Sequence, residues 1–182
     1  MHSNHPHPGP LPQAGEGIKL HWTRWLAISM AVLVLDQLTK YSITASFQYN
    51  ESKFILPFFN LVLAHNTGAA FSFLAGASGW QREFFIGVTV VISALLLWML
   101  RKNHTNRILG VALALVLGGA FGNLYDRVAH GFVVDFIQLH AFGYAWPAFN
   151  VADSAICVGA ALLIWDSFRK PAVSEVSRET ST

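Results

Sequence analysis

ILGVALALVLGGAFGNLY, residues 108–125, is a run of eighteen uncharged residues that ends at Asp126-Arg127. A helix needs about 20 apolar residues to cross the hydrocarbon core of a bilayer. Three more runs approach that length, at residues 25–43, 84–100 and 147–165. Each run predicts a helix, because an isolated strand would leave its backbone polar groups unsatisfied in lipid. The sequence therefore predicts an all-α membrane protein with four transmembrane helices.

The overall composition favours the same class. The chain has 182 residues, which suits one compact unit, and it is 53% hydrophobic and only 12% charged. Soluble domains usually carry about 25% charged residues. The net charge of +2 is too small to indicate a nucleic-acid partner, and a single cysteine, Cys157, excludes an internal disulfide.

Lys and Arg residues beside the predicted spans set the orientation, because short cytoplasmic loops are enriched in them. Eight of the twelve fall on one side, before span one, between spans two and three, or after span four: Lys19, Arg24, Arg101, Lys102, Arg107, Arg169, Lys170 and Arg178. Both termini are therefore predicted to be cytoplasmic, and the loops at 44–82 and 128–146 to face outward.

The ends of the chain differ in composition from its centre. Residues 1–21 include a segment rich in Pro, Gly and His and predict a disordered cytoplasmic tail. A four-span membrane domain is expected over residues 22–168, and a polar cytoplasmic tail over residues 169–182.

The first outer loop contains an apolar segment of its own. Residues 54–63, FILPFFNLVL, are rich in aromatic and branched side chains and predict one or two short strands. The glycine in Gly68-Ala69-Ala70 then allows close backbone approach. This β-structured element has two open interpretations: a surface that lies on the bilayer or pairs with an extended peptide, or a small cap on the helix bundle.

Charged side chains inside the first span indicate a specific role, since a charge within a span is costly. Asp36 and Lys40 are four residues apart with the acid first, the favourable order for an ion pair on a helix. We interpret this pair as a structural clamp that helps to position the outer loop.

The end of the third span combines small and polar residues. The glycines before Asn123 let a neighbouring helix approach closely. Asn123 and Arg127 are also four residues apart and share one helix face. Two readings of Arg127 stay open from spacing alone: a ligand for a phosphate or a peptide carbonyl, or an interface anchor paired with Asp126.

Two acidic residues have mainly apolar surroundings. Asp135 lies within FVVDFI, and Asp153 follows Asn150 by one helical turn in FNVADS. Burial raises the pKa of a carboxyl group. If the segment at 131–137 folds back toward the fourth span, the two carboxyls meet and share one proton. One would then act as base toward water while the other donates a proton to a carbonyl oxygen. A pair of Asp126 with Asp153, or a proton relay through any of the three, remains open.

Five motifs, in this order along the chain, resemble those of the lipoprotein signal peptidases (signal peptidase II), intramembrane aspartic proteases of the peptidase A8 type. Together they run from the first span to the fourth: Asp36-x-x-x-Lys40, Asn66-Thr67-Gly68-Ala69-Ala70-Phe71, Gly118-Gly119-Ala120-x-Gly122-Asn123-x-x-Asp126-Arg127, Val133-Val134-Asp135-Phe136 and Phe149-Asn150-x-Ala152-Asp153.

The resemblance implies a bacterial inner-membrane endopeptidase with four helices, a small extracytoplasmic β-structured cradle in the first outer loop, and an active site near the periplasmic face. Its substrates would be prolipoproteins that carry diacylglycerol on the cysteine just after the cut. The enzyme would contact membrane lipids and need no cofactor, metal or obligate protein partner.

The resemblance also assigns roles to residues. Asp135 and Asp153 become the catalytic pair, and Asp126 takes a structural position instead. The other implied site residues either line the site (Asn66, Gly68, Asn123, Arg127 and Asn150) or support it (Asp36, Lys40, Gly122, Asp126 and Ala152).

Other functions make different predictions. Gly76-Ala77-Ser78-Gly79 is similar to the Gly-x-Ser-Gly of intramembrane serine proteases, but a four-residue motif is weak. A zinc protease is disfavoured because His-Glu-x-x-His is absent from the sequence. A small proton-coupled transporter would use the acids as relay sites. In that case Asp135→Asn would change flux and leave prolipoprotein processing intact.

Overall fold

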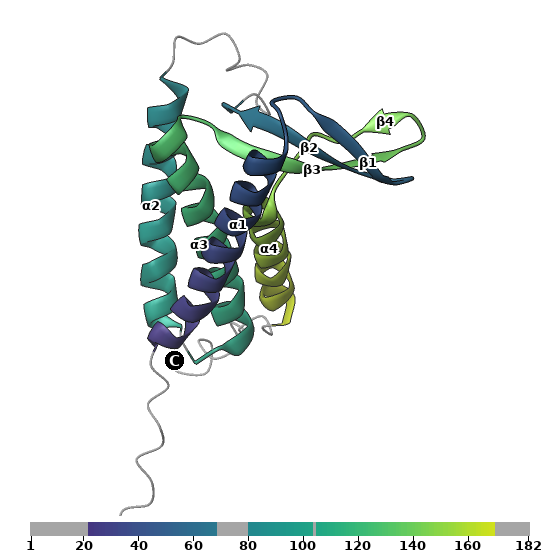
Figure 1. Ribbon diagram of the computed structural model, residues 1–182. Helices are drawn as coiled ribbons and strands as arrows, with labels where there is room; N and C mark the ends of the chain where they lie inside the picture. Colours follow the sequence, from purple (N-terminus) through teal and green to yellow (C-terminus); the bar gives the residue numbers. More distant parts are fainter. Residues whose placement is uncertain (1–21, 69–79, 104, 170–182) are drawn as a thin grey trace, which may run out of the picture.

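The computed structural model describes residues 22–68, 80–103 and 105–169 of the chain. Its helices lie side by side as a bundle (Figure 1). They are the 3-10 turn η1 (Trp22–Trp25) and the α-helices α1 (Leu26–Ser46), α2 (Gln81–Lys102), α3 (Arg107–His130) and α4 (Val151–Arg169). All four α-helices contain segments long and apolar enough to cross a membrane, which confirms the predicted spans.

Helix α3 is the central element of the bundle. Of its apolar segment 61% is buried, against 17–22% for the other three spans. Small residues make this possible: a Cβ on Gly118 would lie 2.7 Å from the backbone oxygen of Ser29 on α1, and one on Gly119 would meet the backbone oxygen of Ala152 on α4. The glycines therefore let α1 and α4 approach α3, as the sequence predicted.

A four-stranded antiparallel sheet lies across one end of the bundle and projects beyond α4 (Figure 1). Strands β1 (Ser52–Leu56) and β2 (Phe59–Asn66) come from the connection between α1 and α2, where the sequence predicted one or two short strands. Strands β3 (Val133–Ala141) and β4 (Tyr144–Ala145) come from the connection between α3 and α4 and complete the sheet in the order β1-β2-β3-β4. Sequence analysis did not assign strands to the second loop.

The ends of two helices differ from the predicted spans. Helix α3 continues to His130, so Asp126 and Arg127 belong to its last two turns. Helix α4 begins at Val151 rather than at residue 147, because the backbone of Phe149 is paired with Ile137 of β3 through bonds of 2.8 and 3.0 Å. Asn150 therefore precedes α4, whereas the sequence placed it inside the helix.

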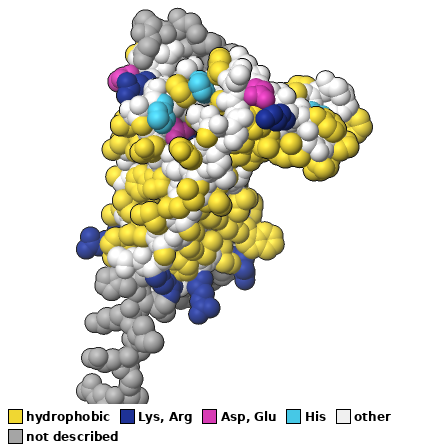
Figure 2. All heavy atoms as spheres, in the orientation of Figure 1, with side chains coloured by type: hydrophobic (Ala, Val, Ile, Leu, Met, Phe, Trp, Pro, Cys, Tyr) yellow, Lys and Arg dark blue, Asp and Glu magenta, His cyan; other side chains and the backbone are white. Residues whose placement is uncertain are grey.

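The surface is divided by side-chain type. On the face in view, Figure 2 shows a broad hydrophobic area over the helices; many of the basic side chains lie at the end away from the sheet, and others lie near the sheet. Arg101, Lys102 and Arg107, in and beside the connection between α2 and α3, are exposed at that end. Acidic site residues such as Asp126 and Asp135 lie at the opposite end, which is the separation that the charge pattern predicted.

Candidate active site

The polar residues of the five motifs converge where the helices meet the sheet, and Lys40 lies at the centre of the deeper part. Its ammonium group is 2.8 Å from a carboxylate oxygen of Asp36 and 2.8 Å from one of Asp126. It also donates to the Asn123 side-chain oxygen at 3.2 Å. The Asp36–Lys40 pair is confirmed, and Asp126 pairs with Lys40 rather than with Arg127.

This buried cluster holds two neighbouring segments in place. The Asp36 carboxylate accepts a 2.9 Å bond from the backbone N–H of Ala152 in the first turn of α4. The Asp126 carboxylate accepts a 3.1 Å bond from the backbone N–H of Val134 on β3. The clamp therefore fixes the start of α4 and strand β3, which belongs to the connection between α3 and α4; the sequence had predicted a clamp that helps to position the outer loop.

Two small residues make room for the clamp. Gly122 faces Asp36, and a Cβ there would lie 2.5 Å from the Asp36 Oδ2 atom and 3.3 Å from the Ala152 side chain. Ala152 is fully buried. Larger side chains at these two positions would force α3 away from α1 and α4.

Gln37 belongs to the same cluster and was missed by sequence analysis. Its side-chain nitrogen lies 3.1 Å from the Asp36 carboxylate, 3.0 Å from that of Asp126 and 3.3 Å from the Gly122 carbonyl. A polar side chain between Asp36 and Lys40 in a membrane span is itself a signal, because polar groups in a span usually face the protein interior.

Asp153 is held at the start of α4 by reciprocal bonds with Asn150. The Asn150 side-chain oxygen accepts from the Asp153 N–H at 2.9 Å, and the Asp153 carboxylate accepts from the Asn150 N–H at 3.2 Å. This is a capping-box arrangement, which satisfies orphan donors of the first helical turn. The Asn123 side-chain nitrogen donates to the other Asp153 oxygen at 2.8 Å. Asn123 thus connects Lys40 to Asp153.

Asp135 lies beside the same asparagine. The Asn150 side-chain nitrogen donates to Asp135 at 2.7 Å, so Asn150 is bonded to both candidate carboxylates. Asn66 also forms a side-chain hydrogen bond with Asp135. Asp135 is 2% exposed. Burial and the nearby Asp153 carboxylate raise the pKa of Asp135 to about 7. The fold-back of 131–137 that the dyad required is therefore present.

The turn that carries Asn66 depends on a glycine. The Asn66 side-chain oxygen accepts a 2.8 Å bond from the Gly68 N–H, and Gly68 has a φ of +103°. A side chain at Gly68 would be strained at this φ, and its Cβ would lie 2.7 Å from the Phe85 ring. Gly68 therefore allows Asn66 to point toward Asp135.

Arg127 approaches the two acids from the end of α3. Its guanidinium is near enough to interact electrostatically with Asp153, Asp135 and Asp126. Within its own helix it donates to the Asn123 carbonyl at 3.1 Å. All the predicted site residues are thus brought together around Asn123 and Asn150.

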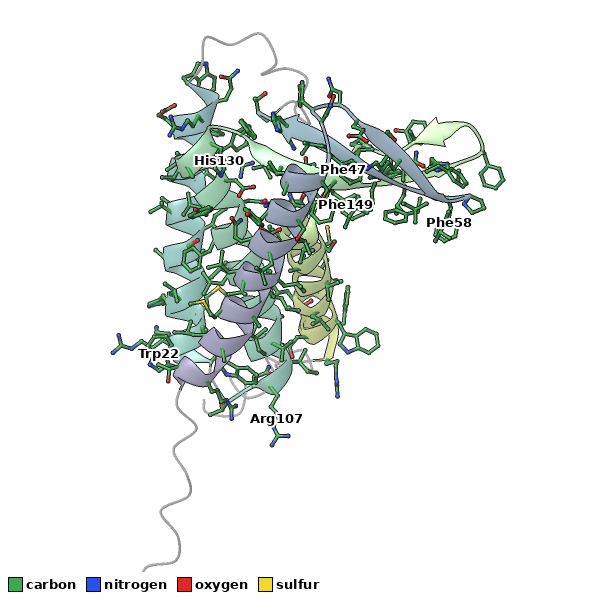
Figure 3. All side chains as sticks on the ribbon, in the orientation of Figure 1. Trp22, Phe47, Phe58, Arg107, His130 and Phe149 are labelled. Atoms are coloured by element: carbon green, nitrogen blue, oxygen red, sulfur yellow. The ribbon has the colours of Figure 1, made fainter. Side chains whose placement is uncertain are left out.

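An apolar groove opens beside Asp153. It has a volume of about 970 Å³ and is walled by the end of β3, by β4 and by the first turns of α4. Figure 3 shows Phe149 near the junction of the helices and the sheet, and Phe58 out on the projecting part of the sheet; both line the groove. A predominantly apolar groove with a carboxylate among its lining residues suits an apolar substrate with one polar reacting bond.

Two other hypotheses find no support from the described residues. Ser78 and its motif lie outside the residues that the structure describes. No group of three or more metal-binding side chains occurs within 22–68, 80–103 and 105–169. His65 instead stacks on Phe132, with ring centroids 3.8 Å apart.

Comparison with known proteins identifies the same family that the sequence motifs resemble. The family model for signal peptidase (SPase) II, Peptidase A8, matches residues 28–169. The lipoprotein signal peptidase of Ralstonia nicotianae is 53% identical over 146 residues, which cover 80% of this chain and 84% of that protein. The lipoprotein signal peptidase of Polynucleobacter necessarius subsp. necessarius is 54% identical over 147 residues, 81% of this chain and 90% of that protein.

Two solved structures, both described as bacterial membrane enzymes determined by the in meso method, are also similar. One, at 1.9 Å resolution, has a TM-score of 0.74 and 35% identity and covers 81% of this chain and 94% of its own. The other, at 2.3 Å, has a TM-score of 0.72 and 34% identity and covers 87% of this chain and 93% of its own.

Proposed function

Because this chain belongs to the signal peptidase II family, Peptidase A8, we propose that Asp135 and Asp153 are the catalytic pair of an aspartic peptidase. The protein is a bacterial multi-pass membrane enzyme that removes signal peptides from prolipoproteins. One observation supports the choice of acids most directly: Asn150 is hydrogen-bonded to both carboxylates.

The two acids would have different roles, Asp135 as the general acid and Asp153 as the general base. Asp135, whose pKa is raised to about 7, keeps a proton near neutral pH, while Asp153 accepts bonds from Asn123 and from the Asn150 backbone. Asp153 removes a proton from water as the water oxygen attacks the peptide carbonyl carbon, and Asp135 protonates the carbonyl oxygen. Asp153 then returns its proton to the leaving nitrogen, and Asp135 recovers a proton as the carbonyl re-forms.

The remaining site residues would orient this pair. Asn66, Asn123 and Asn150 fix the carboxylates by direct bonds, and Gly68 shapes the turn that carries Asn66. Arg127 would contact the substrate backbone and balance the negative charge at Asp153. The support beneath them comes from residues of the clamp and its packing: Asp36, Lys40, Gly122, Asp126 and Ala152.

The proposed substrate is a prolipoprotein that carries diacylglycerol on the cysteine just after the cut. A lipid-anchored cysteine stays at the bilayer interface, which is the depth of the site at the outer ends of the spans. The apolar groove beside Asp153 would receive part of the lipid. Binding apolar chains there would place the neighbouring peptide bond beside the two acids.

The proposed location is the bacterial inner membrane, with both termini cytoplasmic and the site near the periplasmic face. Support comes from the basic residues at the end of the bundle opposite the sheet, since cytoplasmic loops carry an excess of Lys and Arg.

The test compares Asp135→Asn, Asp153→Asn and Asp166→Asn for cleavage of a diacylglyceryl-modified precursor. Asp166 is a matched control: it is a buried acid on α4, bonded to Asn106 at the far end of that helix. We expect the first two variants to lose cleavage and the control to retain it, with all three inserting in the membrane. Normal cleavage by Asp135→Asn or Asp153→Asn would refute the pair.

A further inference from the structure

We propose that the first turns of α2 position Arg127 for catalysis through two side chains, Arg82 and Phe85, which we call the α2 platform. Neither residue belongs to the motifs, and both would act as positioning residues. The inference rests on the proposed role of Arg127 in the site.

Arg82 fixes the backbone from which Arg127 projects. Its Nε donates to the Arg127 carbonyl and one terminal nitrogen donates to the Val128 carbonyl, each at 2.9 Å. The Arg127 carbonyl also accepts from the Gly131 N–H at 3.2 Å, at the end of α3 where few helical donors remain, and the planar Arg82 guanidinium bonds two neighbouring carbonyls at once. Arg82 therefore ties the start of α2 to the end of α3.

Phe85 supports the Arg127 side chain itself. It lies three residues after Arg82, on the same face of α2. The Arg127 guanidinium carbon is 5.2 Å from the centroid of the Phe85 ring, which is within the range of a cation–π contact. The backbone and the charged end of Arg127 are thus both held by α2.

Phe85 also contacts the turn that presents Asn66. The Phe85 ring occupies the space beside Gly68, where a Cβ would lie 2.7 Å from it. Asn66, which shares that turn, is hydrogen-bonded to Asp135. One aromatic ring therefore lies between the cation of the site and the turn that holds one of its acids.

The expected consequence is a change in both rate and pH dependence. Without the ring, the long Arg127 side chain loses its preferred position over the site. The fixed positive charge then acts less on the two acids, so the pH profile of cleavage moves upward. A role confined to packing would lower stability without moving the pH profile.

The test measures kcat/KM of the full-length enzyme on a diacylglyceryl-modified precursor, as a function of pH, for Phe85→Leu, Phe85→Trp and Trp98→Leu. Leucine removes the π face, tryptophan retains it, and Trp98 provides a control on the same helix at the opposite end of the span. We expect Phe85→Leu to lower kcat/KM about 10-fold and to shift the acid limb of the pH–rate profile to higher pH. Phe85→Trp should keep most of the wild-type kcat/KM and most of the wild-type profile. Trp98→Leu should match wild type.

A double-mutant cycle distinguishes an effect that acts through Arg127 from a general structural defect. In an Arg127→Lys background, Phe85→Leu should cost less than about 2-fold, because its action passes through the guanidinium. An equal loss in both backgrounds, or wild-type activity of Phe85→Leu, would overturn the proposal. If Phe85→Leu does not fold, Arg82→Gln decides: a 3- to 10-fold loss of kcat/KM supports the platform, and no loss refutes it.

Failure here is distinguishable from failure of the proposed function. If Asp135→Asn and Asp153→Asn abolish cleavage while the α2 variants behave as wild type, the dyad stands and the platform is wrong. If either Asp variant cleaves normally, the proposed catalytic pair is wrong.

Discussion

Replacing Lys40 by methionine should cost this protein about 3–5 kcal/mol of folding free energy, the usual cost of removing one partner from a buried ion pair. The ammonium group lies 2.8 Å from each of two carboxylates that are almost fully buried. Methionine has similar length but no charge, so Asp36 and Asp126 would face one another without a cation. The cost should fall at the upper end of the range, because two carboxylates lose their partner.

The assay is reversible unfolding in detergent, with Lys53→Met as the matched control. Lys53 pairs with Glu51 at 3.4 Å on the surface, and its side chain is 51% exposed. Exposed pairs contribute about 0–1 kcal/mol. Adding Asp126→Asn to Lys40→Met should recover part of the loss by removing one stranded charge. Equal stability of the two lysine variants would refute the idea that this cluster depends on its cation.

Two further predictions concern the acids. Asp135 has a pKa raised to about 7 against an ordinary value of 3.8, so the folded protein holds a proton that the unfolded chain releases between those values. The free energy of unfolding should therefore fall as pH rises from about 4 to 7, and the melting temperature of Asp135→Asn should not show this pH-dependent fall. Cleavage by the wild-type enzyme should decline above pH 7 as Asp135 loses its proton. Asn150→Ala removes the helix cap and the bond to Asp135, so it should lower the free energy of unfolding by about 1 kcal/mol or more. Its loss of kcat/KM should be much larger than that of Ser154→Ala, the control, which loses only a bond to the Asn150 carbonyl. The first prediction is contradicted if the stability of Asp135→Asn depends on pH as that of the wild type does. The second is contradicted if Asn150→Ala and Ser154→Ala have equal effects.

The spans could be predicted from the sequence because membrane insertion depends on composition over long windows. Residues 108–125 satisfy that requirement without reference to any other part of the chain. Asp36 and Lys40 were likewise paired correctly, since four residues on one helix fix their separation. The resemblance to a known family then supplied the choice of Asp135 and Asp153, which local sequence had left open.

The contacts that could not be predicted from the sequence join segments that are far apart in the chain. Lys40 with Asp126 and Asn123 with Asp153 are 86 and 30 residues apart in the chain, and no local pattern fixes such distances. The second half of the sheet was missed because β3 contains Asp135, Gln138 and His140 and pairs with β2 from another loop. The start of α4 was placed too early because Phe149 looks helical by composition but bonds to Ile137.

The pairing of β3 with β2 has a consequence for biogenesis. Asp135 is carried by a strand whose partner was translated some 70 residues earlier, and Asp153 arrives only with the last helix. A chain still emerging from the ribosome therefore has neither a complete sheet nor a complete pair of acids. With Asp135 and Asp153 as the proposed catalytic pair, we expect proteolytic activity to begin only after α4 is in place, and a partly synthesised copy to have none.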